Sequence, residues 1–247
     1  MHVEIVGNGP RLVLVHGSVA PGWMTWNEQK PLASRFTLVV PIRSGYPPNP
    51  PLERIDFALQ AQELRDLLEP GDHLVAHSYG AVVSMLAAPQ APLASLTVTE
   101  PPAFDVARGH HAVEQFLAHF DSGTPNDPRA YLEFFLPLVG SSLRLSDPLP
   151  PALEAGARAA LAERSPHEAV IPLDKLGRSA FPKLVVSGAH SAAFDAVCDV
   201  LQARLGALRA VLPGAGHSIP RAPGFNETLV DFLERADRHT GTPSASK

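Results

Sequence analysis

The chain has 247 residues, of which 45% are hydrophobic and 18% are charged, and its formal net charge is −5. This length and composition predict one folded α/β domain with an insertion and exclude an intrinsically disordered chain. The negative charge favours neither a nucleic acid nor an anionic membrane as a partner.

The sequence shows no sign of export. Cys198 is the single cysteine, so no intrachain disulfide can form. The amino terminus lacks the charged and apolar regions of a signal peptide, and no apolar run reaches the roughly 18–20 residues that a membrane span requires. These features predict a cytoplasmic protein without a membrane partner and leave its oligomeric state open.

Short apolar runs alternate with longer amphipathic ones, which indicates a mostly parallel central sheet flanked by helices. Parallel strands are covered on both faces, so they are continuously apolar. The first stretch, His2–Val6, alternates instead and ends at Gly7-Asn8-Gly9, which predicts an antiparallel edge hairpin. The continuous runs are Leu12–Val15, Phe36–Val40, His73–Ala76, Leu96–Thr99, Leu184–Val186 and Ala207–Leu212.

Amphipathic runs between these stretches predict the flanking helices. From Phe57 to Leu68, apolar residues recur with the spacing of one helical face. This helix should end at Glu69-Pro70-Gly71-Asp72, because proline and glycine both oppose its continuation. Further helices are predicted at Tyr79–Ala88, Phe194–Leu205 and Gly224–Arg238.

Residues 103–178 break this rhythm. They contain no convincing strand and several proline-rich joints, which predicts a helical cap, or lid, inserted after the strand Leu96–Thr99. Residues 1–102 and 179–238 would form the core, and the small, polar tail 239–247 is predicted to be disordered. The helical patches of the insertion are Ala112–Phe120, Arg129–Leu138 and Ala152–Glu163.

A serine stands between a predicted strand and a predicted helix, in the stretch Ala76-His77-Ser78-Tyr79-Gly80. A sharp turn here would strain the serine and would require small residues two positions before and after it. It would hold the Ser78 hydroxyl at a helix amino terminus, where developing negative charge is favoured. Ala76 stands where glycine is usual in this kind of turn. An ordinary turn serine could have the same five residues, so the prediction that Ser78 is a nucleophile depends on the motifs before and after it.

Upstream, the strand Leu12–Val15 leads into His16-Gly17-Ser18. This is the place expected for a second oxyanion-hole donor. The backbone N–H groups of Ser18 and Tyr79 would then face the carbonyl oxygen of a substrate as it becomes an oxyanion. The alternative is that Gly17 only makes a tight turn.

Downstream, a glycine-rich loop, Pro213-Gly214-Ala215-Gly216-His217, follows the last predicted strand. From there the His217 ring can reach over the end of the sheet toward Ser78, as a general base must. A lone histidine is often structural, but this one follows the serine turn and the His16-Gly17 loop in the order that a serine–acid–histidine triad needs. We therefore predict that His217 is the general base.

These motifs resemble those of the α/β-hydrolase superfamily, in its serine-nucleophile branch, from about Val3 to Arg235. The resemblance implies the α/β-hydrolase fold and a catalytic triad in the chain order serine, acid, histidine. It also implies an oxyanion hole at Ser18 and Tyr79, a helical cap over the pocket and no need for a cofactor.

The acid is where the sequence departs from the usual pattern of the superfamily. Many members carry an aspartate after the strand corresponding to Leu184–Val186, but here the turn is Gly188-Ala189-His190-Ser191. Some members place the acid one strand earlier, where Glu100 stands. Glu100 fits because a strand-end carboxylate can accept from the general base. Asp195 is the alternative acid, although capping alone favours an aspartate near a helix start, and a dyad without a carboxylate also stays open.

Four aromatic residues are candidates for substrate binding. Trp23 follows the oxyanion loop and Tyr46 lies on a rim loop, and for both the alternative is packing. Most aromatic side chains of the insertion must form its own core. Phe104 and Phe135 are predicted to line an apolar pocket.

Other histidines are not predicted to take part in the chemistry. His110-His111 and His119 lack the spacing of metal ligands and have no clustered carboxylates nearby, so no metal site is predicted. His77, beside the nucleophile, is expected to support the site rather than to act in it.

Together these features predict a serine hydrolase that cleaves a carboxylic ester, lactone or thioester of a small, apolar substrate through an acyl-enzyme. Alternatively, the same fold and triad could perform perhydrolase, carbon–carbon bond hydrolase or lyase chemistry, or the chain could be a non-catalytic ligand-binding relic. A serine nucleophile argues against haloalkane dehalogenase and epoxide hydrolase chemistry, for which the superfamily uses aspartate.

Overall fold

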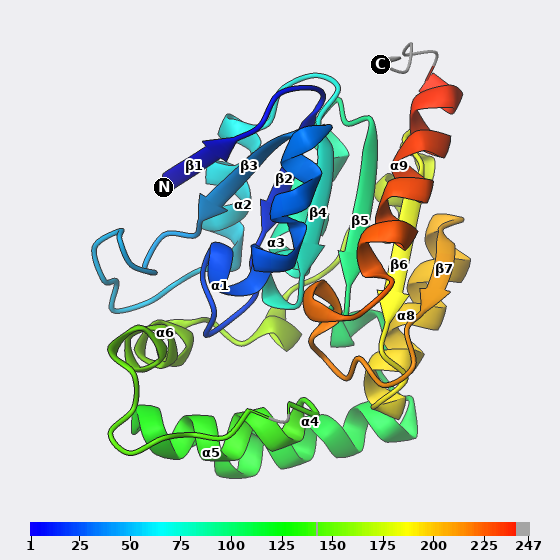
Figure 1. Cartoon of the computed structure of the whole chain (residues 1–247). Helices are drawn as coiled ribbons and strands as arrows, with labels where there is room; N and C mark the ends of the chain where they lie inside the picture. The colour runs from blue at the N-terminus through cyan, green and yellow to red at the C-terminus, as the bar shows by residue number, and fades with distance from the viewer. Residues whose placement is uncertain (142, 241–247) are drawn as a thin grey trace.

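The computed structural model describes residues 1–141 and 143–240, which form one seven-stranded sheet covered by helices (Figure 1). The strand order is β1-β3-β2-β4-β5-β6-β7. The strands are β1 His2–Val6, β2 Arg11–Val15, β3 Thr37–Ile42, β4 His73–His77, β5 Ser95–Thr99, β6 Lys183–Ser187 and β7 Leu208–Val211. The described α-helices are α1 Trp23–Trp26, α2 Phe57–Leu67, α3 Tyr79–Ala87, α4 His111–Gly123, α5 Pro128–Leu138, α6 Pro151–Ala162, α7 Leu173–Arg178, α8 Ala192–Leu205 and α9 Phe225–Thr240.

Neighbouring strands run parallel everywhere except between β1 and β3. The central strands β4, β5 and β6 are buried along their whole length. A strand covered by helices on both faces is surrounded by apolar groups, which explains the continuous apolar runs of the sequence. The predicted fold class, a mostly parallel sheet flanked by helices, is confirmed.

The edge strand β1 corrects one prediction. It is antiparallel, as expected, but it pairs with β3 (His2 opposite Ile42) and not with β2, so residues 2–15 do not form a hairpin. Strand β2 already pairs in parallel with β3 on one side and with β4 on the other. Both edges of β2 are therefore occupied, and the half-exposed β1 takes the outer edge of the sheet.

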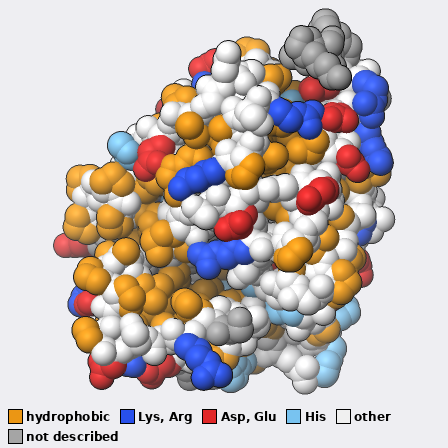
Figure 2. Space-filling model, in the orientation of Figure 1, with side chains coloured by type: hydrophobic (Ala, Val, Ile, Leu, Met, Phe, Trp, Pro, Cys, Tyr) orange, Lys and Arg blue, Asp and Glu red, His pale blue; other side chains and the backbone are white. Residues whose placement is uncertain are grey.

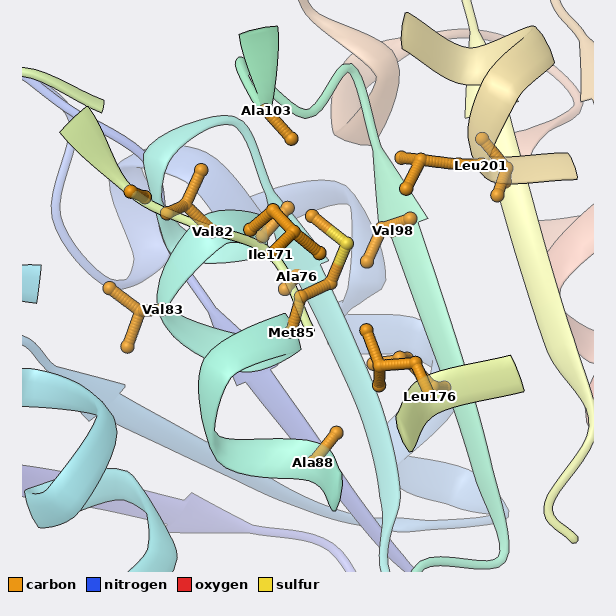
Figure 3. Packing of buried hydrophobic residues seen from close by; sticks show 14 of the residues in the cluster. Ala76, Val82, Val83, Met85, Ala88, Val98, Ala103, Ile171, Leu176 and Leu201 are labelled. Atoms are coloured by element: carbon orange, nitrogen blue, oxygen red, sulfur yellow. The ribbon is translucent and has the colours of Figure 1, made fainter. Parts of the chain in front are cut away.

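Alternate residues of the strands β2, β3, β4 and β6 enter two apolar clusters on opposite faces of the sheet. Val13 belongs to the cluster that contains α2, α3 and α8, whereas Leu12 belongs to the cluster that contains α9. Figure 3 shows part of the first cluster, in which Met85 of α3 lies beside Ala76 of β4. This packing fixes the position of α3 and therefore of the turn that precedes it.

The helical segment 103–178 connects β5 to β6, and its helices α4, α5 and α6 lie below the sheet in Figure 1. Helices α5 and α6 share a small apolar cluster that includes Tyr131, Leu153 and Val19. In contrast, Leu176 of α7 packs in the main core cluster (Figure 3). Phe104, at the start of the segment, packs in the same cluster. The segment thus touches the core at both ends, and a separate cap with a boundary at 178 stays a prediction.

The carboxyl-terminal helix α9 extends through Thr240, so the first two residues of the tail predicted to be disordered are helical. Residues 241–247 of that tail lie outside the described residues. On the face seen in Figure 2, acidic and basic side chains are interspersed. No described helix is both long and apolar enough to cross a membrane.

Candidate active site

Ser78 occupies the predicted turn between β4 and α3. Its backbone angles are φ 53° and ψ −126°, a conformation that costs a non-glycine residue roughly 1–3 kcal/mol. The Ser78 N–H donates to Thr99 O (2.9 Å), which ties the turn to the end of β5. Buried elements on both sides therefore hold the strained serine at the carboxyl end of the sheet.

Gly80 lets α3 approach β2 closely. A Cβ atom at this position would lie 2.3 Å from His16 O and 2.8 Å from Val15 O. Both are backbone atoms, so no side chain can relieve the overlap. Any larger residue would displace α3 together with Ser78.

We expect Gly80→Ala to lower the free energy of unfolding by about 1–3 kcal/mol, the usual cost of overpacking a tight contact. Urea denaturation followed by circular dichroism measures it. Gly123→Ala is the control, because its Cβ would make an ordinary contact 3.5 Å from Phe134 Cε2. Equal denaturation midpoints for the two variants would contradict the prediction.

Ser78, His217 and Glu100 form a hydrogen-bonded row. Ser78 Oγ lies 2.8 Å from His217 Nε2, and His217 Nδ1 lies 3.3 Å from Glu100 Oε2. An ionised carboxylate only accepts hydrogen bonds, so we assign the ring proton to Nδ1, and Nε2 then accepts from the serine hydroxyl. The structure thus brings together the three side chains predicted as a triad, and their catalytic roles stay predictions.

Glu100 is held in place by the end of β6, by the loop that follows it and, through that loop, by the loop that carries His217. Its N–H donates to Val186 O (2.9 Å), and its Oε1 accepts from the Gly188 N–H (2.6 Å). Its backbone φ is +47°, which is uncommon for a residue other than glycine. A Cβ on Gly188 would lie 1.9 Å from Gly216 O, so glycine at 188 allows the two loops to touch and brings His217 to Glu100.

Burial sets the protonation of this row. It raises the pKa of Glu100 to about 7, while the Gly188 N–H bond and His190 act in the opposite direction. Burial, with a smaller effect of His190, lowers the pKa of His217 to about 3. His217 is therefore neutral near neutral pH. A group that accepts a proton from serine must be neutral beforehand.

Asp195, the alternative acid, lies elsewhere. Its Oδ1 accepts from the Ser187 hydroxyl (2.8 Å) and lies 3.5 Å from Arg209 Nη2. Its side chain is 36% exposed, whereas that of Glu100 is fully buried. The first turn of α8 thus places this carboxylate beside Arg209 of β7, whereas Glu100 is the carboxylate that contacts His217, so Glu100 stays our prediction for the acid.

The row opens onto a cavity of about 230 Å³. Ser78 and His217 line one side of this cavity, and aromatic and aliphatic side chains of segment 103–178 line much of the rest. Phe104 and Phe135 are among them, in the position predicted for substrate-binding residues. A second cavity of about 310 Å³ shares Phe135 and His217 with the first, so the two cavities meet at the row.

Ser18 and Tyr79, the predicted oxyanion donors, line the same cavity. Tyr79 is the first residue of α3, and the amides of a first helical turn have no acceptor within their own helix. Neither the Ser18 amide nor the Tyr79 amide donates to another residue in the described ranges. Both remain available to an oxygen atom in the cavity.

Arg43 supports the loop that carries Ser18. Its guanidinium donates to His16 O (3.0 Å) and to Gly17 O (2.7 Å), and it forms an ion pair with Glu163 at 2.6 Å. Both charged side chains are buried. A buried charge needs such partners, because the loss of its hydration costs several kcal/mol.

Glu163 joins segment 103–178 to this loop. A short parallel bridge places it, in which the Ile55 N–H donates to Ala162 O (2.7 Å). Its carboxylate accepts from the Tyr46 hydroxyl (2.8 Å) and from the Ser18 hydroxyl. One buried carboxylate thus connects the end of α6 to a predicted oxyanion donor.

We expect Glu163→Gln to lower the free energy of unfolding by about 3–5 kcal/mol, because it leaves the buried Arg43 without its counter-charge. Tyr46→Phe removes a hydroxyl that donates to Glu163 (2.8 Å) and accepts from the Val19 N–H (3.4 Å). It removes no charge, so a decrease of about 1–3 kcal/mol is expected. Glu154 forms an exposed ion pair with Arg158, so Glu154→Gln should change the free energy of unfolding by less than about 1 kcal/mol. Urea denaturation ranks the three, and a Glu163 effect no larger than that of Glu154 would contradict the role of the buried pair.

The structure places two of the residues predicted as substrate contacts outside both of these cavities. Trp23 lines neither of these two cavities and packs against the cluster that contains α9, with Lys30 Nζ 5.3 Å from its ring centroid. Tyr46 is fully buried, and its hydroxyl is bonded to Glu163. Closeness to the rim in sequence does not determine whether a ring turns toward the cavity or into the core.

Three residues of the site are not predicted from the sequence: Arg43, Glu163 and His190. Arg43 follows the carboxyl end of β3, which is a weak positional signal of a rim residue. Glu163 has no such signal, because it lies 120 residues from Arg43. His190 lies in the turn where many relatives have the triad acid, and its Nδ1 is 3.5 Å from Glu100 Oε2.

A family model described as "Alpha/beta hydrolase family" matches residues 12–225 of the chain. Comparison with curated protein sequences yields no match.

Solved structures share the fold over almost the whole chain. An α/β hydrolase from Sphaerobacter thermophilus is 24% identical, with 94% of this chain and 95% of that chain covered and a TM-score of 0.67. A putative epoxide hydrolase from Pseudomonas aeruginosa is 18% identical, with coverages of 96% and 92% and a TM-score of 0.70. A carboxylesterase from Bacillus subtilis is 19% identical, with coverages of 94% and 87% and a TM-score of 0.68.

Proposed function

The chain belongs to the alpha/beta hydrolase family, and from this premise we propose that it is a serine hydrolase that cleaves a carboxylic ester, lactone or thioester. The observation that carries the proposal is the row Ser78–His217–Glu100 at the wall of a cavity. A serine hydroxyl is a weak nucleophile until an adjacent base accepts its proton. Here the neutral His217 ring lies in hydrogen-bond reach of that proton.

The first half-reaction forms an acyl-enzyme. Ser78 Oγ attacks the carbonyl carbon while its proton passes to His217 Nε2. The carbon–oxygen or carbon–sulfur bond to the leaving group then breaks, and His217 returns the proton to the leaving atom. Glu100 stabilises the imidazolium that forms between these two steps. In the second half-reaction water replaces Ser78 by the same route.

The negative charge that develops on the carbonyl oxygen needs hydrogen-bond donors. The Ser18 and Tyr79 amides fill this role in our proposal, because both residues line the cavity beside Ser78. One such donor typically contributes ~2.7–4 kcal/mol to transition-state stabilisation. Glu163 and Arg43 hold the Ser18 loop and thus act as positioning residues.

The cavity favours a small substrate with an apolar acyl group. Its volume of about 230 Å³ leaves room for a short chain or one ring. Segment 103–178 closes the cavity in our proposal and serves as the cap. The phenylalanine and tyrosine side chains that line the cavity are Tyr79, Phe104, Phe116, Phe120, Tyr131, Phe135 and Phe194.

Covalent labelling tests the proposal. The folded protein should react with a fluorophosphonate probe at one site, which peptide mass mapping should place on Ser78. It should also hydrolyse short p-nitrophenyl esters with an initial burst of nitrophenol. Heat-denatured protein is the control for labelling, because only the folded row activates the serine. A folded protein that neither reacts with the probe nor turns over any ester would overturn the proposal.

A further inference from the structure

His190 is a buried imidazole without a hydrogen bond. Its side chain is 12% exposed, and neither ring nitrogen has a hydrogen-bond partner among the described residues. Its Nδ1 lies 3.5 Å from Glu100 Oε2, close to the carboxylate but not in hydrogen-bonding geometry. Buried ring nitrogens usually have a hydrogen-bond partner or bind a ligand, and the nitrogens of His190 are able to accept one.

The surroundings hold His190 against the triad. Its ring lies 5.6 Å from the Phe194 ring and 6.0 Å from the His217 ring, measured between centroids. A Cβ on Gly140 would come within 2.6 Å of His190 Cδ2, so the chain packs directly on the imidazole. The ring therefore stays beside Glu100 and His217.

Glu100, His190 and His217 have the donor set and the spacing of a zinc site. One possible ligand atom from each lies within 4.8 Å of the other two. Glu100 Oε2 lies 3.3 Å from His217 Nδ1 and 3.5 Å from His190 Nδ1, close to the ~3.4 Å between ligand atoms around a tetrahedral ion with 2.0–2.1 Å bonds. Two histidines and one glutamate are a common set of protein ligands for zinc.

We propose that Glu100, His190 and His217 form a binding site for Zn²⁺, and that the ion switches the triad off. The binding half of this inference stands on the geometry alone, and the inhibitory half rests on the proposed function. His190 is the residue that distinguishes the site from an ordinary triad, because it supplies the third ligand.

Inhibition follows from the two nitrogens of His217. In the metal-free row Nδ1 carries the ring proton and Nε2 accepts from Ser78. A metal ion takes the lone pair of Nδ1, so the ring proton moves to Nε2, and the imidazole stays neutral. Nε2 then donates to Ser78 Oγ and can no longer accept its proton. The charge of the ion also keeps Glu100 ionised, and a water molecule is left as the fourth ligand.

Calorimetric titration of Ser78→Ala with Zn²⁺ tests binding without any catalysis. We expect one ion per chain, and we expect His190→Gln in the same background to weaken binding at least about tenfold. His111→Gln is the matched control, because His111 is exposed on α4, and it should bind as the parent does. Should His190→Gln fail to fold, the visible spectrum of bound Co²⁺ in Ser78→Ala decides, since a tetrahedral complex supports the site and an octahedral one contradicts it.

Inhibition is measured on the active protein. Zn²⁺ should abolish ester hydrolysis and a chelator should restore it, and His190→Gln should require at least about tenfold more Zn²⁺ for half-inhibition. Hydrolysis that Zn²⁺ does not affect, or equal binding by the His190 and His111 variants, would overturn the inference and leave the hydrolase proposal intact. Binding through His190 by a protein without any hydrolase activity would instead support the site and refute the proposed function.

Discussion

Replacing Ser78 by alanine is expected to lower kcat for p-nitrophenyl esters by about 10⁴–10⁶-fold, because the variant has no nucleophile and the acyl-enzyme cannot form. The variant should also no longer be labelled by a fluorophosphonate probe. The free energy of unfolding should fall by no more than about 0.5–1.5 kcal/mol, because alanine loses the hydrogen bond to His217 Nε2 but adds no atom to the turn.

Ser84→Ala is the matched control for this prediction. Ser84 lies on α3 and is buried, as Ser78 is. The Ser84 hydroxyl has no hydrogen-bond partner among the described residues. Its loss should change kcat by less than about twofold. Comparable activity in the Ser78 and Ser84 variants would show that the hydrolysis comes from another nucleophile.

Replacing Glu100 by glutamine should lower kcat by about 10³–10⁴-fold. Glutamine has nearly the same shape, and its carbonyl oxygen can still accept from the Gly188 N–H. It carries no charge, however, and its amide group can present a donor to His217 Nδ1. The ring would then adopt the other tautomer, with its proton facing Ser78, and the imidazolium would lose its stabilising carboxylate.

The stability of the Glu100 variant separates a catalytic effect from misfolding. Burial raises the pKa of Glu100 to about 7, which means that the ionised form is costly in the folded state. A neutral amide avoids this cost, so the free energy of unfolding should not decrease by more than about 1 kcal/mol.

Asp195→Asn is the control for the choice of acid. Asp195 contacts Ser187 and Arg209 and does not reach His217, so this variant should keep kcat within about threefold of the parent. An inactive Asp195→Asn together with a fully active Glu100→Gln would reverse the assignment of the acid.

The sequence by itself predicted the parts that depend on local chemistry. A parallel strand buried on both faces must be apolar along its length, so the strand positions were visible without the structure. The serine turn needs small residues two positions before and after the serine. At Gly80 the structure shows why, because a Cβ atom there would overlap the backbone at the end of β2. Glu100 was predicted from its place at a strand end, and the structure puts it beside His217.

The tertiary structure alone decided the contacts between distant segments. Strand β1 pairs with β3 because both edges of β2 are occupied, and nothing in His2–Val6 encodes that competition. Trp23 packs half-buried against the core and Tyr46 is fully buried in it, although both neighbour the rim. Glu163 meets Arg43 across 120 residues, because the packing of α6 and not any local pattern brings them together. The spacing of apolar residues in the sequence indicates which residues are buried. The partner of each buried charge depends instead on how the whole chain is packed.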